Sequence, residues 1–508
     1  MVFVLDGLRP DSINPVDTPN LYRLRREGVS WTNSHSAVPT VTRVNSSVIG
    51  SGAYPANTGI VGNTMYVPAM GPSPFDTGQA DNLTRLDELT GGRMLLTETL
   101  GERLTDAGKK VVAIGSGSSG GTLLLNPRAP RGNGVMINAG DVTPTRPFTY
   151  PTSVGDEILA RFGPPPAGDE GGPNAKVDYT EEVLRDYVLT ELEPDVVLNW
   201  FTQPDGSQHE FGAGSPEGLF TIRNDDRQIG LILDRLEELG LSERTNILVV
   251  SDHGFSLHDF NVNLTQELVD AGLKESSTSE DVVVANSGSS LVHVQNRDPG
   301  KIRAIVEFLQ RQPWSGALYT AAARPRDGRY TPSPGRPRPD GWVRGTFSLE
   351  LIHHDNAERG ADIVVTYPWS NELNTFGVPG TSGNAGGGPT GPLTGPGSGH
   401  GSFSPWDVRN TFIAWGADVK DGRTIIKAPA GNVDIGPTLL ALEGLRPDTP
   451  DGRVLTEAFT GGPDERRLKV RTRTFRTAAD GGRYRAAVQI SELDGQRYRY
   501  VDQSRRLP

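Results

Sequence analysis

The sequence predicts an α/β protein in which helices cover both faces of a central, mostly parallel sheet. Short apolar runs without polar alternation indicate strands that are buried on both faces. Longer amphipathic segments lie between these runs, and this alternation is typical of an open sheet with crossover helices. The six runs are "VFVLD" (2–6), "KVVAIG" (110–115), "DVVLNWF" (195–201), "NILVVSD" (246–252), "DIVVTY" (362–367) and "TFIAWG" (411–416).

Five segments between the runs have apolar residues at helical spacing. They are residues 18–29, 95–108, 180–192, 219–240 and 432–445. Ligands bind beyond the carboxyl ends of the strands in such sheets, so functional residues are expected just after the apolar runs.

Three segments rich in Gly and Pro interrupt the alternation, at about 126–175, 323–341 and 376–402. We interpret them as loop-rich insertions in a single catalytic domain that spans residues 1–508. The tail at 467–503 alternates like strands and predicts a small C-terminal β element, such as an edge hairpin.

Composition excludes several classes of function. The chain has 508 residues and a net charge of −12, which disfavours a nucleic-acid partner bound through its phosphates. It has no cysteine, so disulfides, Cys-ligated zinc and a thiol nucleophile are excluded. No run of about 18 apolar residues exists, and this predicts no membrane span. The opening "MVFVLDGLRPDS" enters a predicted strand at once and shows no signal-peptide pattern.

Aspartates and histidines gather where strands are predicted to end. The "DHG" after one buried run is a stronger signal than a lone Asp, which is more often a turn or N-cap residue. In "QPDGSQHEFG" an Asp and a His stand four apart, which places them on one face of a helical turn. A further His closes the glycine-rich segment at 376–402. The six residues are Asp6, Asp205, His209, Asp252, His253 and His400.

This set of ligands contains nitrogen and oxygen but no sulfur, which suits zinc or a similar divalent ion. Six protein ligands exceed the usual three or four for one zinc. The sequence therefore predicts two metal ions, an arrangement suited to in-line displacement at phosphorus. The cluster "HHD" (353–355) is a rival site, but neighbouring residues on a strand point to opposite faces, so we interpret it as structural.

The chemistry also needs a nucleophile, and "VPTVTRVNSSVIGSG" (38–52) offers several hydroxyls at a predicted helix start. Backbone N–H groups there can face an oxyanion. Thr40, Thr42, Ser46 and Ser47 are all candidates by position, and their spacing does not choose among them.

Five blocks in the same order resemble the type I phosphodiesterase/nucleotide pyrophosphatase branch of the alkaline phosphatase superfamily. They are "VLDGLRPD", "PTVTRVNSSVIGSGAYPANTGIVGNTMY", "QPDGSQHEFG", "VSDHGF" and "GSGHGS". The resemblance implies an alkaline-phosphatase-like fold, a small phosphate-ester substrate, two zinc ions and an extracytoplasmic location.

The resemblance also implies individual roles. Thr42 becomes the nucleophile that forms a phosphothreonine intermediate and also ligates one metal. Asn63, together with N–H groups near Thr42, becomes the ligand of the phosphate oxygens. One metal is assigned to Asp205, His209 and His400, and the other to Asp6, Asp252 and His253.

The chain departs from the family pattern in two places. The family usually has "TFPNH" from the nucleophile onward, whereas this chain has "TRVNS", and Thr58 stands where a His is common. Arg43 therefore replaces an aromatic residue, and it could bind the extra charge of a phosphomonoester. Tyr66 and Trp200 could stack on a substrate ring or could simply pack.

Several alternatives remain open at this point. A phosphomonoesterase or a phosphonate hydrolase would use the same site, and a transferase would move a phosphate-linked head group. A sulfatase is disfavoured because no C/S-x-P-x-R motif lies near Thr42. A non-catalytic binding protein is disfavoured by the complete ligand set. The sequence does not indicate an oligomeric state.

Overall fold

Strand β1 (Val2–Leu5) lies near the middle of a nine-stranded sheet in the computed structural model, which describes residues 1–143, 146–167, 170–322, 338–493 and 497–508. Five of the eight strand pairings in this sheet are parallel. The order is β22 (Thr424–Ile426), β2 (Val29–Trp31), β21 (Phe412–Gly416), β10 (Asn246–Val250), β1, β9 (Val196–Phe201), β6 (Val111–Gly115), β7 (Val135–Thr143) and β8 (Arg146–Tyr150).

Both faces of this sheet are buried. Alternate residues of each strand point to opposite sides, so each strand contributes to two apolar layers. Phe3 and Leu5 pack in one apolar layer with residues of α1, α7, α8 and α10. Val2 and Val4 pack in the other layer with residues of α2, α5, α6 and α14. Full burial of each such side chain contributes about 1.5–3 kcal/mol, so both layers hold the sheet in place.

The predicted helices are present, with shifted ends. The helices are α1 (Pro19–Glu27), α2 (Thr42–Ile49), α3 (Pro55–Thr58), α4 (Ala80–Leu89), α5 (Leu100–Asp106), α6 (Ser119–Leu125), α7 (Thr152–Phe162), α8 (Ala175–Val183), α9 (Asp205–Phe211), α10 (Pro216–Glu238), α11 (Leu264–Asp270), α12 (Pro299–Arg311), α13 (Pro405–Val408) and α14 (Ile435–Leu442). A capping box at Thr99 starts α5 five residues after the predicted helix begins. Residues 180–192 continue from α8 into a π-helical stretch, Leu184–Leu192.

Two strand predictions need correction. The run at 362–367 forms β16 (Ile363–Val365), but β16 lies in a separate sheet and pairs antiparallel with both neighbours. The run at 411–416 does join the central sheet, where it is antiparallel to β10 and β2. An apolar run shows that both faces of a strand are buried, but it does not show the strand's direction or its sheet.

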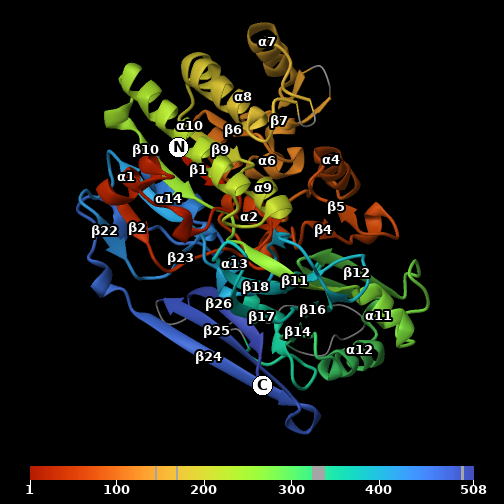
Figure 1. Ribbon diagram of the computed structural model, residues 1–508. Coiled ribbons are helices and arrows are strands. Elements are labelled where there is room, and N and C mark those ends of the chain that lie inside the picture. The colour runs from red at the N-terminus through yellow and green to blue at the C-terminus, as the bar shows by residue number, and fades with distance from the viewer. Residues whose placement is uncertain (144–145, 168–169, 323–337, 494–496) are drawn as a thin grey trace.

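Smaller sheets lie below the central sheet in Figure 1. One contains β17 (Trp369–Leu373), β18 (Pro379–Ala385), β11 (Ser256–Val262) and β19 (Gly391–Pro392), with β20 (Ser398–Gly399) also paired to β11. Another contains β12 (Val282–Ser287), β13 (Ser289–Val294), β16, β14 (Leu318–Thr320) and β15 (Phe347–Ser348). Two short pairs are β23 (Ala430–Gly431) with β3 (Ser34–His35) and β4 (Thr64–Met65) with β5 (Phe75–Asp76).

The glycine-rich segment 376–402 is therefore more than a loop, since it supplies β18, β19 and β20. These strands carry the chain back to the carboxyl edge of the central sheet. Of the predicted insertion 323–341, residues 323–337 lie outside the described part of the chain.

The C-terminal segment forms its own antiparallel sheet of β24 (Val470–Ala479), β25 (Tyr484–Leu493) and β26 (Tyr498–Arg506). The small C-terminal β element is confirmed, but it is not an edge hairpin of the central sheet. Within the described ranges, no helix combines the length and the apolar character needed to cross a lipid bilayer.

Candidate metal centre and active site

The aspartates and histidines predicted as ligands converge at the carboxyl edge of the central sheet. Asp6 follows β1, Asp252 and His253 follow β10, and α9 begins at Asp205 just after β9. These three strands are neighbours in the order β10-β1-β9, so their carboxyl ends lie side by side. His400 reaches the same place from the end of β20.

Short distances connect the six side chains. Asp205 Oδ1 lies 3.3 Å from Nε2 of His209 and 3.3 Å from Nε2 of His400. His253 Nε2 lies 3.5 Å from Asp6 Oδ1 and 2.9 Å from Asp252 Oδ2. The rings of His253 and His400 stack with their centroids 3.6 Å apart. The predicted set is thus one cluster.

Two overlapping groups in this cluster could each hold a metal ion. One contains Asp205, His209 and His400, and the other contains Asp6, Asp205 and His253; within each group the ligand atoms lie within 4.8 Å of one another. Asp205 belongs to both groups, whereas the family resemblance implied that it holds one metal only. Asp252 joins the second group through His253.

Backbone carbonyls orient all three histidines. His209 Nδ1 lies 2.9 Å from Ser398 O, His253 Nδ1 2.9 Å from Gly254 O, and His400 Nδ1 2.9 Å from Thr40 O. A carbonyl only accepts, so each Nδ1 donates a proton, and in the neutral imidazole the lone pair then lies on Nε2. Metal-binding histidines are commonly held in this way.

The donor atoms of this cluster are short of partners. Asp6 Oδ1, Asp205 Oδ1, Asp252 Oδ2 and His253 Nε2 are buried and make no hydrogen bond in the described part of the chain. Buried polar atoms without partners are costly, and divalent cations would satisfy all four. Aspartate oxygens and imidazole nitrogens suit zinc or a similar ion.

The charges of the cluster act on one another. Burial, followed by the negative charges of Asp205 and Asp252, raises the pKa of Asp6 well above its ordinary value. Burial also acts to raise the pKa of Asp205, but His209 and His400 outweigh it and hold that pKa well below its ordinary value. Bound cations would relieve the repulsion among the carboxylates.

The cluster is closed at one end and open at the other. Asp252 and His253 are fully buried, whereas the side chain of His209 is 44% exposed. A ligand from solvent would therefore approach from the side of α9.

The four candidate hydroxyls differ in their hydrogen-bond partners. Thr40 Oγ1 donates to Ser402 O and accepts from the N–H of Gly401. Ser46 donates to Gly121 O, and Ser47 donates to Val44 O. The hydroxyl of Thr42, at the first residue of α2, makes no hydrogen bond to any described residue. Of the four, Thr42 alone has a hydroxyl that is not already engaged.

Asn63 lies beside Arg43, the residue that follows Thr42. Its Oδ1 accepts a hydrogen bond of 2.9 Å from the backbone N–H of Arg43, and its Nδ2 makes no hydrogen bond to a described residue. The backbone N–H of Arg43 is thus already engaged by Asn63.

The structure adds residues that sequence reasoning missed. Trp200 donates from its indole N–H to Asp6 Oδ2 at 3.1 Å, so it orients a ligand in addition to packing. The N–H of Gly7 holds Asp252 Oδ1 at 3.0 Å. The Trp near the end of a buried run was the available signal for the first contact, but the direction of its side chain depended on the pairing of β9 with β1.

The two predicted substrate-binding residues lie in different places. Arg43 lines a cavity of about 440 Å³ at the open end of the cluster, and its positive charge acts on His209. Tyr66 lines another cavity together with Glu280 and Arg297, and its ring meets His293 edge-on. A role for Tyr66 in substrate binding stays a prediction.

The "HHD" cluster has separate partners. His353 stacks on Tyr54 at 4.1 Å, and His354 Nε2 lies 2.9 Å from Val61 O. The prediction assumed that these residues lie on a strand, but they follow a 3-10 turn.

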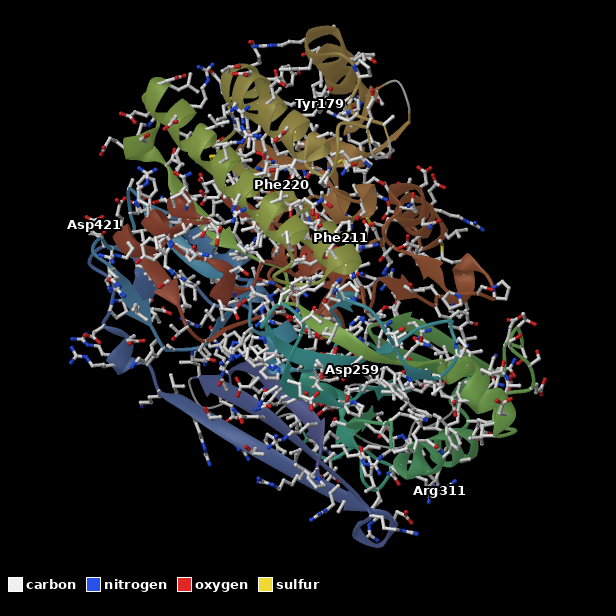
Figure 2. All side chains as sticks on the ribbon, in the orientation of Figure 1. Tyr179, Phe211, Phe220, Asp259, Arg311 and Asp421 are labelled. Carbon is white, nitrogen blue, oxygen red and sulfur yellow. The ribbon has the colours of Figure 1, made fainter. Side chains whose placement is uncertain are left out.

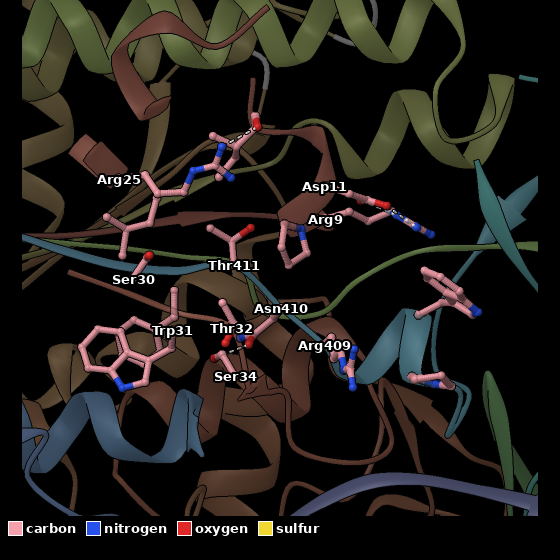
Figure 3. A pocket seen from close by; sticks show the side chains of 16 residues that line it. Arg9, Asp11, Arg25, Ser30, Trp31, Thr32, Ser34, Arg409, Asn410 and Thr411 are labelled. Atoms are coloured by element: carbon pink, nitrogen blue, oxygen red, sulfur yellow. Dashed lines mark hydrogen bonds and ion pairs between the residues drawn. The ribbon is translucent and has the colours of Figure 1, made fainter. Parts of the chain in front are cut away.

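A further cavity of about 350 Å³ lies beside β2 and β21 (Figure 3). Its polar groups are largely engaged within the protein: Arg9 pairs with Asp11 and donates to two carbonyls, and Ser34 donates to Asn410. The residues that line it include none of those predicted for the site.

Comparison with known proteins agrees with this arrangement. The family described as type I phosphodiesterase / nucleotide pyrophosphatase matches residues 1–332. The chain is 25% identical over 260 residues to human ectonucleotide pyrophosphatase/phosphodiesterase family member 1, covering 50% of this chain and 23% of that protein.

Two other relatives match a similar share of the chain. Human family member 7 is 27% identical over 259 residues, covering 50% of this chain and 47% of that protein. The venom phosphodiesterase of Macrovipera lebetinus is 25% identical over 262 residues, covering 50% of this chain and 25% of that protein. The match thus spans less than half the length of each relative.

The mixed α/β architecture, with its large, mostly parallel central sheet, is that of an alkaline-phosphatase-like protein. Together with the match over residues 1–332, it shows that the chain belongs to the type I phosphodiesterase/nucleotide pyrophosphatase family.

Proposed function

We propose that this protein hydrolyses phosphate diesters in two displacements, with Thr42 as the nucleophile and two divalent cations, zinc by the chemistry of the ligands, held by the Asp/His cluster. One observation supports this most directly: the unengaged hydroxyl of Thr42 lies at the start of α2, two residues after Thr40, whose carbonyl accepts from His400 of the cluster of unpartnered ligand atoms. The names of the relatives, which include phosphodiesterases, agree with it.

Residues Asp6, Asp205, Asp252, His209, His253 and His400 would hold the cations, which supply Lewis-acid stabilisation of negative charge when bound. Thr42 Oγ1 forms a bond to phosphorus as the ester bond to one alcohol breaks, and that alcohol leaves with a proton. Water then attacks the phosphothreonine, the bond between phosphorus and Oγ1 breaks, and Thr42 regains its proton.

The chain's own donors hold the phosphate during both steps. Asn63 Nδ2 donates to a non-bridging oxygen, and one such donor can contribute about 2.7–4 kcal/mol at an oxyanion site. Arg43, the next residue after Thr42, adds positive charge on the open side.

Thr42→Ala tests the proposal directly. We expect turnover of bis(4-nitrophenyl) phosphate to fall by at least about 10³-fold, as for other nucleophile deletions. Zinc bound per chain, measured by mass spectrometry, should stay near two. Thr40→Ser, which keeps the hydroxyl that holds Ser402 and Gly401, serves as the control. Full activity of the Thr42 variant would remove Thr42 from the mechanism.

A phosphomonoesterase is the second candidate, because the positive charge of Arg43 beside Thr42 suits a dianion. A dominant rate on 4-nitrophenyl phosphate over the diester would favour it. A transferase would instead show product formation that depends on an acceptor alcohol. We also propose an extracytoplasmic location, in line with relatives named as ectoenzymes and venom enzymes.

A further inference from the structure

A polar cavity adjoins the open end of the metal cluster. It begins at Arg43, passes α9 at Ser207 and Glu210, and extends to Thr202 after β9 and Lys176 on α8. Strands β9 and β6 follow β1 in the sheet order, so the cavity continues the row of strand ends that carries the ligands. With a volume of about 440 Å³, it has room for one ester group of a diester.

Much of the cavity wall has no large side chain. Five glycines line it: Gly78, Gly117, Gly140, Gly172 and Gly206. A Cβ at Gly78 would lie 2.4 Å from Arg43 Nη2, so glycine at this position is what lets the guanidinium lie beside Asp76. The cavity thus gains width from the glycines, while polar side chains supply its chemistry.

Several of these polar groups are free to bind a ligand. In the described part of the chain, the side chains of Gln79, Lys176, Thr202 and Glu210 make no hydrogen bond or ion pair, and Arg43 Nε is buried without a partner. Together they offer an ammonium, a carboxylate, an amide and a hydroxyl. This mixture of donors and acceptors matches sugar or polyol hydroxyls, each of which both donates and accepts.

The residues that line this cavity are poorly suited to bind a nucleobase. Bases are commonly held by stacking on aromatic side chains. Phe211, labelled on α9 in Figure 2, is the single aromatic residue among the described residues that line this cavity. The presence of Glu210 beside Arg43 and Lys176 also disfavours a group that is only anionic.

We infer that this cavity binds a polyhydroxylated, non-aromatic ester group, so that the substrate class is a phosphodiester of a sugar or polyol. The inference rests on the proposed diesterase function and names its specificity. Arg43 binds the phosphate end of the group, and Lys176 and Glu210 form hydrogen bonds with its hydroxyls.

The test uses diesters that share one leaving group. Methyl, glyceryl, glucose-6-yl and thymidine-5′-yl 4-nitrophenyl phosphates release the same nitrophenolate, so differences in kcat/KM report the retained group. We expect the glucosyl diester to exceed the methyl diester by about 10-fold or more, because a site built for hydroxyls rejects analogues that lack them. The thymidine diester should stay within about 3-fold of the methyl diester.

Two variants assign the preference to this cavity. Lys176→Met and Glu210→Gln should each lower the ratio of the glucosyl to the methyl rate, whereas Lys469→Met, an exposed lysine before β24, should leave that ratio unchanged. A thymidine diester that is the best substrate, or equal rates for all four, would overturn the inference while leaving the diesterase intact. Failure to hydrolyse any of the four would instead overturn the proposed function.

A binding measurement distinguishes failure of the inference from failure of the proposed function. Metal-loaded Thr42→Ala protein should bind glucose 6-phosphate more tightly than thymidine 5′-phosphate in a calorimetric titration. The opposite order would contradict the inference without any need for turnover.

Discussion

Thr40 and Thr42 lie two residues apart, yet their hydroxyls have opposite surroundings. Thr40 is bound to the loop that carries His400, through Ser402 and Gly401. Thr42 has no such partner. The spacing of the sequence could not distinguish them, because the groups that engage Thr40 lie more than 360 residues further along the chain.

Trp200 makes a testable contribution at the same scale. Trp200→Phe removes the indole N–H that holds Asp6 Oδ2, and loss of such supporting contacts typically weakens metal binding by about 10–100-fold. We expect a weaker zinc affinity of this size in a competition titration with a chromogenic chelator.

Trp31→Phe is the matched control for this change. Trp31 packs in the same apolar layer as Trp200, and its indole N–H makes no hydrogen bond in the described chain. An equal loss of zinc affinity in both variants would show that packing, and not the contact to Asp6, is responsible.

At the scale of elements, five of the six predicted strands lie in the central sheet, and the sixth, β16, does not. Asp6, Asp252 and His253 could be grouped from the sequence because they follow apolar runs, which mark strand ends, whereas His400 follows the glycine-rich segment. The pairing of strands could not be predicted in the same way. β16 lies in another sheet because it pairs with Ser290–Val292, and no local pattern in residues 362–367 specifies that partner.

Helices α8 and α10 bury an acid against β9. Glu181 is fully buried, its Oε2 accepts from Asn199 Nδ2, and both oxygens of nearby Asp225 lack hydrogen-bond partners. Burial raises the pKa of Glu181 from 4.5 to about 8.

This shift predicts a dependence of stability on pH. Between pH 4.5 and about 8 the folded chain keeps the proton of Glu181, while the unfolded chain has lost it. The free energy of unfolding should therefore fall as pH rises through this window, by up to about 1.4 kcal/mol per pH unit. Glu181→Gln removes this contribution and should be more stable than the parent at pH 8.

Urea unfolding at pH 5 and at pH 8 measures the effect. The difference between Glu181→Gln and the parent should be small at pH 5 and larger at pH 8. Glu182→Gln, at the exposed neighbouring position, should show no such change. A constant difference across the two pH values would contradict the assignment.

At the scale of the whole molecule, the C-terminal sheet is fastened to the core near the active site. Asp502 on β26 accepts from Nε2 of His35 at 2.8 Å and from Ser491, and all three are buried. His35 immediately precedes Ser36, whose hydroxyl donates to the backbone carbonyl of Asp252, a predicted ligand.

Asp502→Ala tests this connection. It leaves His35 and Ser491 buried without their partner, and we expect a loss of about 2–4 kcal/mol in the free energy of unfolding. Urea unfolding should show the change, and Asp448→Ala, an exposed aspartate, should not. A loss below about 0.5 kcal/mol would show that the sheet is only loosely attached.

The order of strands in the central sheet has a consequence for biosynthesis. Val2 pairs with Leu198 on one side and Leu248 on the other, so β1 has no partner in this sheet until β9 has been synthesised. Until then the apolar segment Val2–Leu5 lacks both strand partners, and unpaired apolar strands of an incomplete chain are prone to aggregate.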